Sequence, residues 1–363
     1  MQKNTPLNLL GGLSPAQFMK RHWQKKPLLI RQAIPNMRPL IDRAALLDMV
    51  ESEEVESRLI VRNGEKWTLK KGPLKRKSLP SLKTPDWTVL IQGVDLHSHA
   101  VHALLQQFRF VPDARLDDVM ISFAVEGGSV GPHIDQYDVF LVQAMGHRKW
   151  QIEAEARHEP AFRPDSELKL LQEFKADYSW DLAPGDVLYL PPGYAHHGVA
   201  LDQCMTFSVG MRAPSGAEML VDFAEDLAQK LPEYRRYEDP DLKVAEDPYE
   251  IDDQAFARVE EALTTWQQAD ASERRRWFGQ FITRYRASGD VQAGPDQVSW
   301  PQALNALSTG HSLYRHPFAR FAWSREANQA LLHVTGESYP VSPHEAALLC
   351  RETVLHIADF NGL

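Results

Sequence analysis

Cysteine is nearly absent from this chain. Only Cys204 and Cys350 occur among its 363 residues, and no Cys-x-x-Cys pair is present. A disulfide framework and a structural zinc site built on thiolates are therefore excluded. So little cysteine is typical of proteins in a reducing compartment, which predicts a cytoplasmic location.

Long apolar runs and a basic excess are also missing. No stretch approaches the roughly 18 consecutive apolar residues of a membrane span. The N-terminus, MQKNTPLNLLGGLSPAQF, lacks the charged start and apolar core of a secretory signal. The formal net charge of −9 disfavours a general nucleic-acid binder and permits a basic protein partner. We therefore expect neither a membrane nor a direct nucleic-acid contact.

The pattern of apolar residues divides the chain into three parts of an α+β protein. Residues 1–213 open with a helix start at Ser14 and Pro15 and a strand in KKPLLIRQAI. Many short strands separated by Gly and Pro turns follow, which predicts an antiparallel sandwich or barrel. Residues 214–290 show helical spacing in AEMLVDFAEDLAQKL, DQAFARVEEALTTWQQ and SERRRWFGQFITRYRA. Residues 291–363 combine short helical and strand-like pieces with a final helix expected in HEAALLCRETVLHIADF, a texture that suits a winged helix.

The stretch EDPDLKVAEDPYEIDD, residues 238–253, carries eight acidic residues and a single lysine. We interpret it as a solvated loop or linker, in preference to a docking strip for a basic partner.

A histidine and an aspartate stand one residue apart in GPHIDQYDVF, which reads as a β-strand. Residues i and i+2 of a strand point the same way, so His133 and Asp135 are expected to share a face. This is the only His-x-acid tripeptide in the chain. An ordinary hydrogen-bonded polar pair is the alternative to metal binding, and a third ligand is needed to decide.

A third ligand is available in LAPGDVLYLPPGYAHHG, residues 182–198. A histidine on a later strand of the same barrel can point into the same interior as His133. Two histidines and one aspartate form the facial triad of non-haem Fe(II) oxygenases, which leaves three positions for a chelating co-substrate and O₂. Neighbours on a strand face opposite ways, so one of His196 and His197 binds and the other lies at the rim. Zinc is the alternative metal, although no HExxH helix is present.

An oxygenase of this type also needs a cation for the far carboxylate of its co-substrate. Arg148 lies 15 residues beyond His133 and offers a bidentate guanidinium. A surface charge within the basic triplet His147 to Lys149 is an equally good interpretation of the spacing.

Further polar residues share faces with one another inside apolar strands. Asp118, Met120 and Ser122 alternate with apolar residues in DDVMISF, and Thr206 and Ser208 do so in CMTFSVGMR. Polar groups that face a barrel interior need partners, and a bound ligand can supply them. The alternative for each is a side chain satisfied by the backbone.

Tyr137 has the parity of His133 and Asp135, so it should line the same interior. A second group of histidines, His97, His99 and His102, does not share one helical face, and we interpret these as surface or capping residues.

Two long runs resemble the JmjC-type ribosomal oxygenases, and in particular their bacterial branch, the ribosomal protein arginine hydroxylases. The runs are DDVMISFAVEGGSVGPHIDQYDVFLVQAMGHRKWQI and LAPGDVLYLPPGYAHHGVALDQCMTFSVGMRAP, and FMKRHWQKKPLLIRQAI fits the same family. The resemblance implies a double-stranded β-helix (cupin-like) catalytic domain over residues 1–213, a helical dimerisation region over 214–290 and a winged-helix domain over 291–363. It also implies Fe(II) as the metal, with 2-oxoglutarate and O₂ as co-substrates.

The resemblance assigns roles by position. It implies that His133, Asp135 and His196 bind iron and that Arg148 binds 2-oxoglutarate, with Ser122 and Thr206 beside it. Relatives often carry Asn at the position of Thr206. The residues matched to the grip on a substrate arginine are Asp118, Met120, Tyr137 and Ser208.

The implied reaction is hydroxylation of the β-carbon (C3) of one arginine in a large-subunit ribosomal protein, number sixteen, by a cytoplasmic homodimer. Two other functions stay open from the sequence. One is a JmjC-type demethylase of N-methyl-lysine, which the metal site does not distinguish. The other is a non-catalytic cupin that serves as an adaptor in ribosome assembly.

Overall fold

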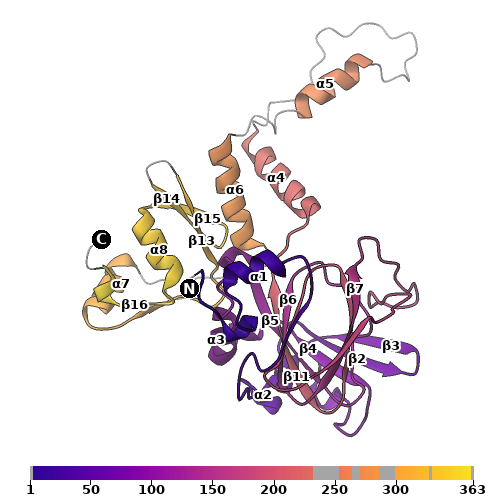
Figure 1. Ribbon diagram of the computed structural model, residues 1–363. Helices are drawn as coiled ribbons and strands as arrows, with labels where there is room; N and C mark the ends of the chain where they lie inside the picture. Colours follow the sequence, from indigo (N-terminus) through magenta and orange to yellow (C-terminus); the bar gives the residue numbers. More distant parts are fainter. Residues whose placement is uncertain (1–2, 232–252, 264–269, 286–298, 327–328, 361–363) are drawn as a thin grey trace. The chain divides into compact units, whose positions relative to one another are not determined.

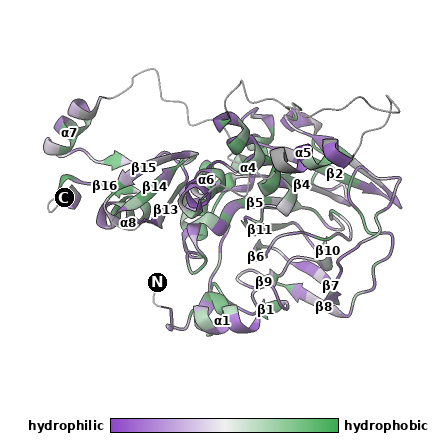
Figure 2. Cartoon of the chain, turned by 90° about the horizontal axis from the view of Figure 1, so that it is seen from above, coloured by the Kyte–Doolittle hydropathy of each residue, from purple (hydrophilic) through white to green (hydrophobic). Residues whose placement is uncertain are grey.

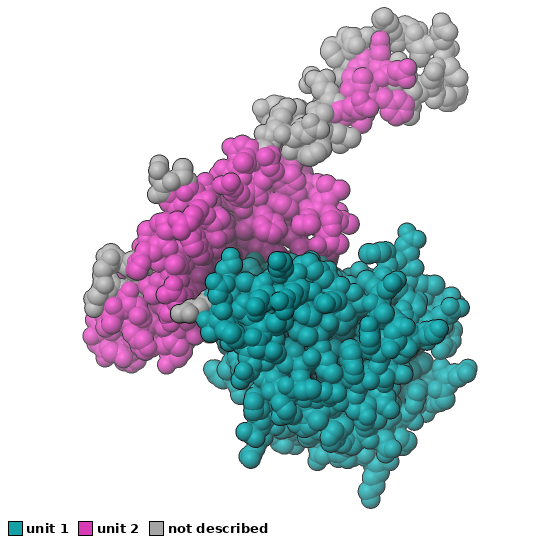
Figure 3. All heavy atoms as spheres, in the orientation of Figure 1, with its two compact units in different colours: residues 1–213 teal, residues 214–363 magenta. Residues whose placement is uncertain are grey.

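The computed structural model describes residues 3–231, 253–263, 270–285, 299–326 and 329–360. The chain forms two compact units, Met1–Ala213 and Pro214–Leu363 (Figure 3). The acidic stretch 238–252 and the segment 288–297 lie outside the described residues. No helix in the described part of the chain is both long and apolar enough to span a bilayer.

The first unit contains two antiparallel sheets (Figure 1). The eight-stranded sheet has the order β1-β9-β6-β11-β5-β4-β2-β3, and the three-stranded sheet has the order β10-β7-β8. Figure 2 shows β1, β9 and β6 side by side. The strands are β1 (Leu28–Ile30), β2 (Ser57–Asn63), β3 (Lys66–Lys71), β4 (Trp87–Ile91), β5 (Leu116–Ala124), β6 (Val139–Met145), β7 (Arg148–Ala156), β8 (Tyr178–Leu182), β9 (Val187–Leu190), β10 (Tyr194–Ala200) and β11 (Cys204–Met211).

Alternation along β5 explains how this sheet divides its two faces. Val119, Ile121 and Phe123 are fully buried in the larger apolar core. That core also contains apolar residues of the N-terminal helices α1 (Pro15–Arg21), α2 (Arg43–Asp48) and α3 (His99–Gln106). The other face of β5 turns toward the three-stranded sheet, as the hydrogen bond between Arg148 and Ser122 shows. The two sheets together form the expected double-stranded β-helix.

Helix α1 begins as its sequence predicts. The Ser14 side chain and Gln17 form a capping box, and Pro15 occupies the first helical position, where its missing N–H is not needed. This helix supplies Phe18, which is fully buried against Phe140 and Tyr189.

We expected the segment that carries His133 and Asp135 to be a strand, and this prediction is wrong. His133 makes a single bridge with His196, and residues 134–138 form a loop that leads into β6. At the end of the loop the buried Asp138 carboxylate accepts hydrogen bonds from Tyr189 Oη (2.6 Å) and Gln24 Nε2 (2.9 Å). These contacts let an irregular segment hold a defined path into β6.

The second unit contains helices α4 (Gly216–Lys230), α5 (Asp253–Leu263) and α6 (Ala271–Arg284), followed by a small α+β domain. That domain has a three-stranded sheet of β13 (Phe321–Arg325), β14 (Ala330–Val334) and β15 (Glu337–Val341), the pair β12 (Leu313–Tyr314) and β16 (Val354–Leu355), and helices α7 (Trp300–Ser308) and α8 (Pro343–Arg351). The final helix is shorter than expected, because the chain turns after Glu352 and pairs through β16 with β12.

Helix α6, which we expected in the middle region, packs on the C-terminal sheet. Gly279 lies directly against the His333 ring, and a Cβ there would come within 2.3 Å of it. Gly336 N donates to Thr283 Oγ1 at 3.0 Å. The position of a domain boundary at residues 290–291 stays a prediction.

Candidate metal and co-substrate site

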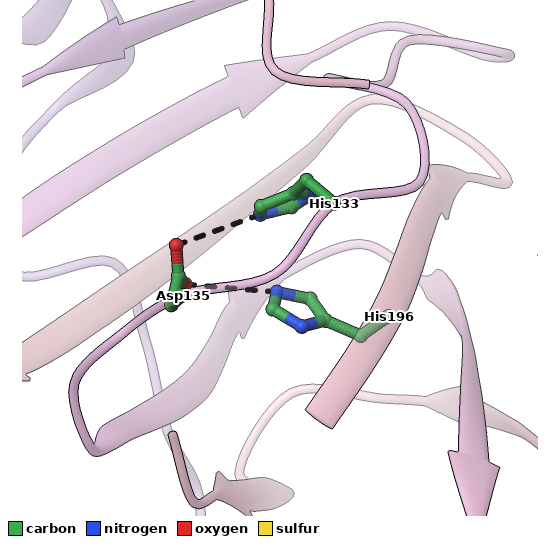
Figure 4. A group of neighbouring side chains, drawn as sticks. All are labelled: His133, Asp135 and His196. Carbon is green, nitrogen blue, oxygen red and sulfur yellow. Dashed lines mark ion pairs between the residues drawn. The ribbon is translucent and has the colours of Figure 1, made fainter. Parts of the chain in front are cut away.

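The structure brings His133, Asp135 and His196 together from the loop before β6 and from β10. One ligand atom of each lies within 4.8 Å of the others. His133 Nε2 is 4.0 Å from Asp135 Oδ1, and His196 Nε2 is 3.7 Å from Asp135 Oδ2. Figure 4 shows the three side chains pointing toward one another. Two reciprocal backbone hydrogen bonds of 3.0 Å between residues 133 and 196 hold the two histidines side by side.

Both imidazoles are oriented by the backbone. His133 Nδ1 lies 2.9 Å from Gly131 O, and His196 Nδ1 lies 2.9 Å from Tyr194 O. A carbonyl oxygen only accepts, so Nδ1 carries the hydrogen and Nε2 turns its lone pair toward Asp135. Burial, assisted by the neighbouring His133, lowers the pKa of His196 to about 4, so its imidazole is neutral near neutral pH.

This donor set fits a divalent transition metal. Two imidazole nitrogens and one carboxylate on one side of a common point leave the other side to ligands from solution, as in non-haem iron sites. The same donors suit zinc, so the triad alone does not separate the two metals.

His197 is not part of the triad. It is half-buried, its ring lies edge-on to Phe174 at 6.0 Å, and its Nε2 has no hydrogen-bond partner in the described structure. The interpretation that its neighbour His196 faces the metal agrees with this geometry.

Arg148 is a buried cation with unused donors. The residue is 5 % exposed, at the start of β7, and its Nη1 donates to Ser122 Oγ at 3.3 Å. Nε and Nη2 are buried and have no hydrogen-bond partner within the part of the chain that the structure describes. Among the described residues, no carboxylate lies within 4.0 Å of this guanidinium. Its place inside the barrel rules out a surface charge, and its unpaired donors fit an anion that comes from outside the chain.

Ser122 and Thr206 lie opposite each other on β5 and β11. Thr206 Oγ1 donates to Gln143 Oε1 at 2.9 Å. The Gln143 amide is fixed in this orientation, because its Nε2 donates to Met145 O (2.9 Å) and Gly146 O (3.2 Å). The single hydroxyl hydrogen of Thr206 is therefore used within the protein, and its remaining lone pairs are left as acceptors.

Sequence reasoning missed Gln143 as part of the site. The signal was present, because a glutamine within the apolar strand VFLVQAM has to find buried partners.

The residues expected to bind a substrate lie around the N-terminal half of β5. Asp118 Oδ2 accepts from Gln92 Nε2 (2.9 Å) and Gly93 N (2.8 Å). Burial, and then the charges of Asp117 and Asp95, raise the pKa of Asp118 to about 7.

The other expected grip residues lie near Asp118. Met120 and Ser208 lie opposite each other on β5 and β11, and Arg58 Nη2 lies 4.0 Å from Met120 Sδ. Tyr137 is 37 % exposed, and the neighbouring Asp135 carboxylate raises the pKa of its phenol, which stays neutral. Arg58 and Gln92 are two members of this group that the sequence did not indicate.

The histidine group near residue 100 forms no metal cluster within the described ranges. His97 ends a 3₁₀ turn, and His99 is exposed at the first turn of α3.

Comparison with known proteins agrees with this geometry. Residues 103–219 match the family model of the JmjC domain, and residues 267–361 match that of the ROXA-like winged helix. A triad of this kind inside a double-stranded β-helix defines a JmjC-type oxygenase, which uses Fe(II) and 2-oxoglutarate.

Two curated relatives narrow the class. The ribosomal protein uL16 3-hydroxylase of Escherichia coli (strain K12) is 36% identical over 300 residues, which span 82% of this chain and 79% of that protein. A probable ribosomal oxygenase of Haemophilus influenzae is 34% identical, over 64% of this chain and 56% of that protein. The solved structure of the E. coli ribosomal oxygenase YcfD with cobalt and 2-oxoglutarate has a TM-score of 0.78 and 32% identity, covering 95% of this chain and 91% of that one. The chain belongs to this family of ribosomal oxygenases.

Proposed function

We propose that this oxygenase hydroxylates the β-carbon of an arginine in the large-subunit ribosomal protein uL16, number sixteen of that subunit. The observation that carries the proposal is the buried Arg148, whose unpaired donors lie in the barrel that also holds a complete His-Asp-His triad. The uL16 3-hydroxylase activity of the E. coli relative supports the choice of substrate.

Each site residue has a proposed task. His133, Asp135 and His196 hold Fe(II), which together with 2-oxoglutarate supplies the activation of O₂ when bound. Arg148 neutralises the far carboxylate of 2-oxoglutarate, and Ser122 holds one end of the guanidinium in place. Thr206, opposite Ser122 on β11, is proposed to offer its hydroxyl oxygen as a hydrogen-bond acceptor beside the co-substrate.

Water is kept from the co-substrate end of the site, where Arg148 and His196 are buried. Trp150 and Ile152 of β7 pack with Val139 and Leu141 of β6 in a second apolar core. Water exclusion strengthens the pairing of Arg148 with a carboxylate, because the local dielectric is low.

The substrate arginine is proposed to lie between Tyr137 and Asp118, with Met120 and Ser208 beside it. The free Oδ1 of Asp118 is an acceptor for a guanidinium N–H, since Oδ2 is already engaged by Gln92 and Gly93. Because Asp118 fixes the position of the guanidinium, it also determines which C–H bond of the arginine side chain faces the metal.

The chain is proposed to act as a cytoplasmic homodimer through its middle helices. Large apolar side chains are exposed on all three of them: Leu220 (68%) and Val221 (59%) on α4, Phe256 (56%) on α5 and Phe278 (43%) on α6. Asp222 of α4 accepts from Trp277 Nε1 (2.8 Å) and Arg284 Nη2 (2.6 Å), so α4 and α6 form one surface. A second copy can bury these residues. The winged helix is proposed to serve the fold without contacting DNA.

The test is incubation of the purified protein with uL16, Fe(II), 2-oxoglutarate and O₂, followed by mass spectrometry of the peptides. Addition of one oxygen atom to an arginine, with stoichiometric succinate, is the expected result. Release of formaldehyde from a methylated lysine peptide would instead support a demethylase, and absence of any 2-oxoglutarate turnover would support an adaptor.

A further inference from the structure

The most basic stretch of the chain is residues 66–83, KWTLKKGPLKRKSLPSLK. It contains six lysines, one arginine and no acidic residue, in a chain whose formal net charge is −9. The stretch forms β3 and the 3₁₀ turn Arg76–Ser78, and β3 is an edge strand of the eight-stranded sheet (Figure 1). All six of its lysines are exposed, and none has a carboxylate within 4.0 Å in the described part of the chain. We call the five on β3 and at the 3₁₀ turn the lysine edge: Lys66, Lys70, Lys71, Lys75 and Lys77.

The backbone under the lysine edge is anchored. Leu74 and Leu79 pack against the larger apolar core, and Leu74 N donates to Val50 O at 2.7 Å. Arg76 N donates to Glu51 Oε1 at 2.8 Å. The charges therefore project from a fixed surface, and a partner that binds them orders side chains only.

The lysine edge lies on the same sheet as Ser122 and Thr206, whereas Arg148 and His196 lie on the three-stranded sheet that faces them. Thr206, Ser122, Leu90, Arg58 and Lys71 follow one another across β11, β5, β4, β2 and β3 as directly paired residues. Paired residues point to the same face, so Lys71 shares the face that carries Ser122. Three strand spacings separate the two residues, which is roughly 14 Å. A large molecule that presents a side chain to the metal site can therefore also reach Lys71, while Lys66 and Lys70 project from the other face of the same edge strand.

The composition of this surface favours a phosphate backbone. No large apolar side chain is exposed between residues 57 and 86, so the surface offers nothing to insert into a bilayer or to anchor a protein partner. Lysine is depleted at protein–protein interfaces, which rely on aromatic and arginine anchors. Lysines without apolar anchors suit the sequence-independent neutralisation of phosphates.

We propose that the lysine edge binds the phosphate backbone of RNA. The net charge had led us to expect no nucleic-acid contact, and the local clustering of lysine on one anchored edge overrides that average. One consequence rests on the proposed function: a ribosomal protein that is still bound to its RNA can present its arginine to the metal site and nearby phosphates to the lysine edge.

The test uses the full chain and a labelled, mixed-sequence single-stranded RNA of about 20 nucleotides, followed by fluorescence anisotropy over a range of salt concentrations. Four to five phosphate contacts predict that the affinity falls roughly a hundredfold between about 50 and 200 mM salt. The variant Lys70→Gln/Lys71→Gln/Lys75→Gln/Lys77→Gln should reduce the salt slope by about 3 and lose most of the affinity. The control Lys20→Gln/Lys25→Gln/Lys26→Gln/Lys175→Gln removes the same charge elsewhere in the same unit and should retain both. Thermal unfolding of each variant shows that it is folded.

Three outcomes would overturn the proposal: no RNA binding by the wild type, equal loss in both variants, or binding of the acidic peptide of residues 238–253 or of anionic phospholipid vesicles in place of RNA. The RNA measurement needs neither iron nor 2-oxoglutarate, so its failure leaves the proposed hydroxylation untouched. Conversely, a failure to hydroxylate isolated uL16 removes the proposed function and leaves RNA binding intact. If both hold, the ratio of hydroxylation rates on RNA-bound and isolated uL16 should fall in the lysine-edge variant.

Discussion

Replacement of Arg148 by methionine should stabilise the ligand-free protein and abolish its response to 2-oxoglutarate. The guanidinium is 5 % exposed, has two buried unpaired donors, and has no carboxylate within 4.0 Å among the described residues. A buried charge without a partner opposes folding, and a side chain of similar length that carries no charge removes that penalty. We expect the free energy of unfolding to rise by about 1–4 kcal/mol.

The same substitution removes the anion-binding group. Two hydrogen bonds from a charged donor contribute about 1.5–3 kcal/mol each, or about 3–6 kcal/mol together. That loss corresponds to a roughly hundredfold to ten-thousandfold weaker affinity for 2-oxoglutarate. At a concentration about 100 times its Kd, 2-oxoglutarate stabilises the wild type by about 2.7 kcal/mol and should stabilise the variant by no more than about 0.4 kcal/mol.

Thermal unfolding with and without 2-oxoglutarate, in the presence of Mn(II) in place of iron, measures both effects. Arg148→Lys retains the charge and loses the fork of donors, so its response to 2-oxoglutarate should lie between the two. Arg43→Met is the control, because Arg43 is exposed, and its stability should change by no more than about 0.5 kcal/mol. A lower Tm for ligand-free Arg148→Met, or an undiminished response to 2-oxoglutarate, would refute the reasoning.

Three further predictions follow from the site. His133→Ala and Asp135→Ala should abolish succinate formation and leave the circular dichroism spectrum unchanged; normal turnover in either would show that the ligands are misassigned. The pKa of Asp118, raised to about 7 by burial and then by Asp117 and Asp95, predicts that KM for the arginine substrate rises as the pH falls below about 7, since only the carboxylate pairs with a guanidinium. That dependence should vanish in Asp118→Asn, and its persistence would assign the titration to another group. Gln143→Leu and Thr206→Val should each lower the free energy of unfolding by about 1–3 kcal/mol, with a coupling of at least about 0.5 kcal/mol in the double variant. Additive effects would mean that the hydrogen bond of 2.9 Å between them does not contribute to stability.

Much of the barrel could be predicted because its strands alternate. In β5, the residues Val119, Ile121 and Phe123 face the core, and the polar set between them faces the interior, as period 2 requires. The start of α1 could also be predicted, because the cap at Ser14 and the proline at position 15 are local features that need no tertiary contact.

The parts that could not be predicted depend on contacts distant in sequence. The loop of residues 134–138 is held by Asp138 through Gln24 and Tyr189, which lie 114 and 51 residues away. Spacing left Arg148 undecided between the surface and the interior, and only its pairing across the barrel with Ser122 places it. The final helix was predicted to be longer than it is. Nothing within HEAALLCRETVLHIADF indicates that the helix stops early, because its end depends on the pairing of β16 with β12.

The paired backbone bonds between His133 and His196 have a consequence for metal supply. Because backbone hydrogen bonds set the spacing of the two imidazoles, the protein itself does little to select among divalent ions of similar size. Divalent first-row metals differ in affinity mainly by their intrinsic order, which does not favour iron. Cobalt occupies the E. coli relative in its solved structure. Which metal loads this enzyme is therefore decided by the ions that the cell makes available to the folded chain.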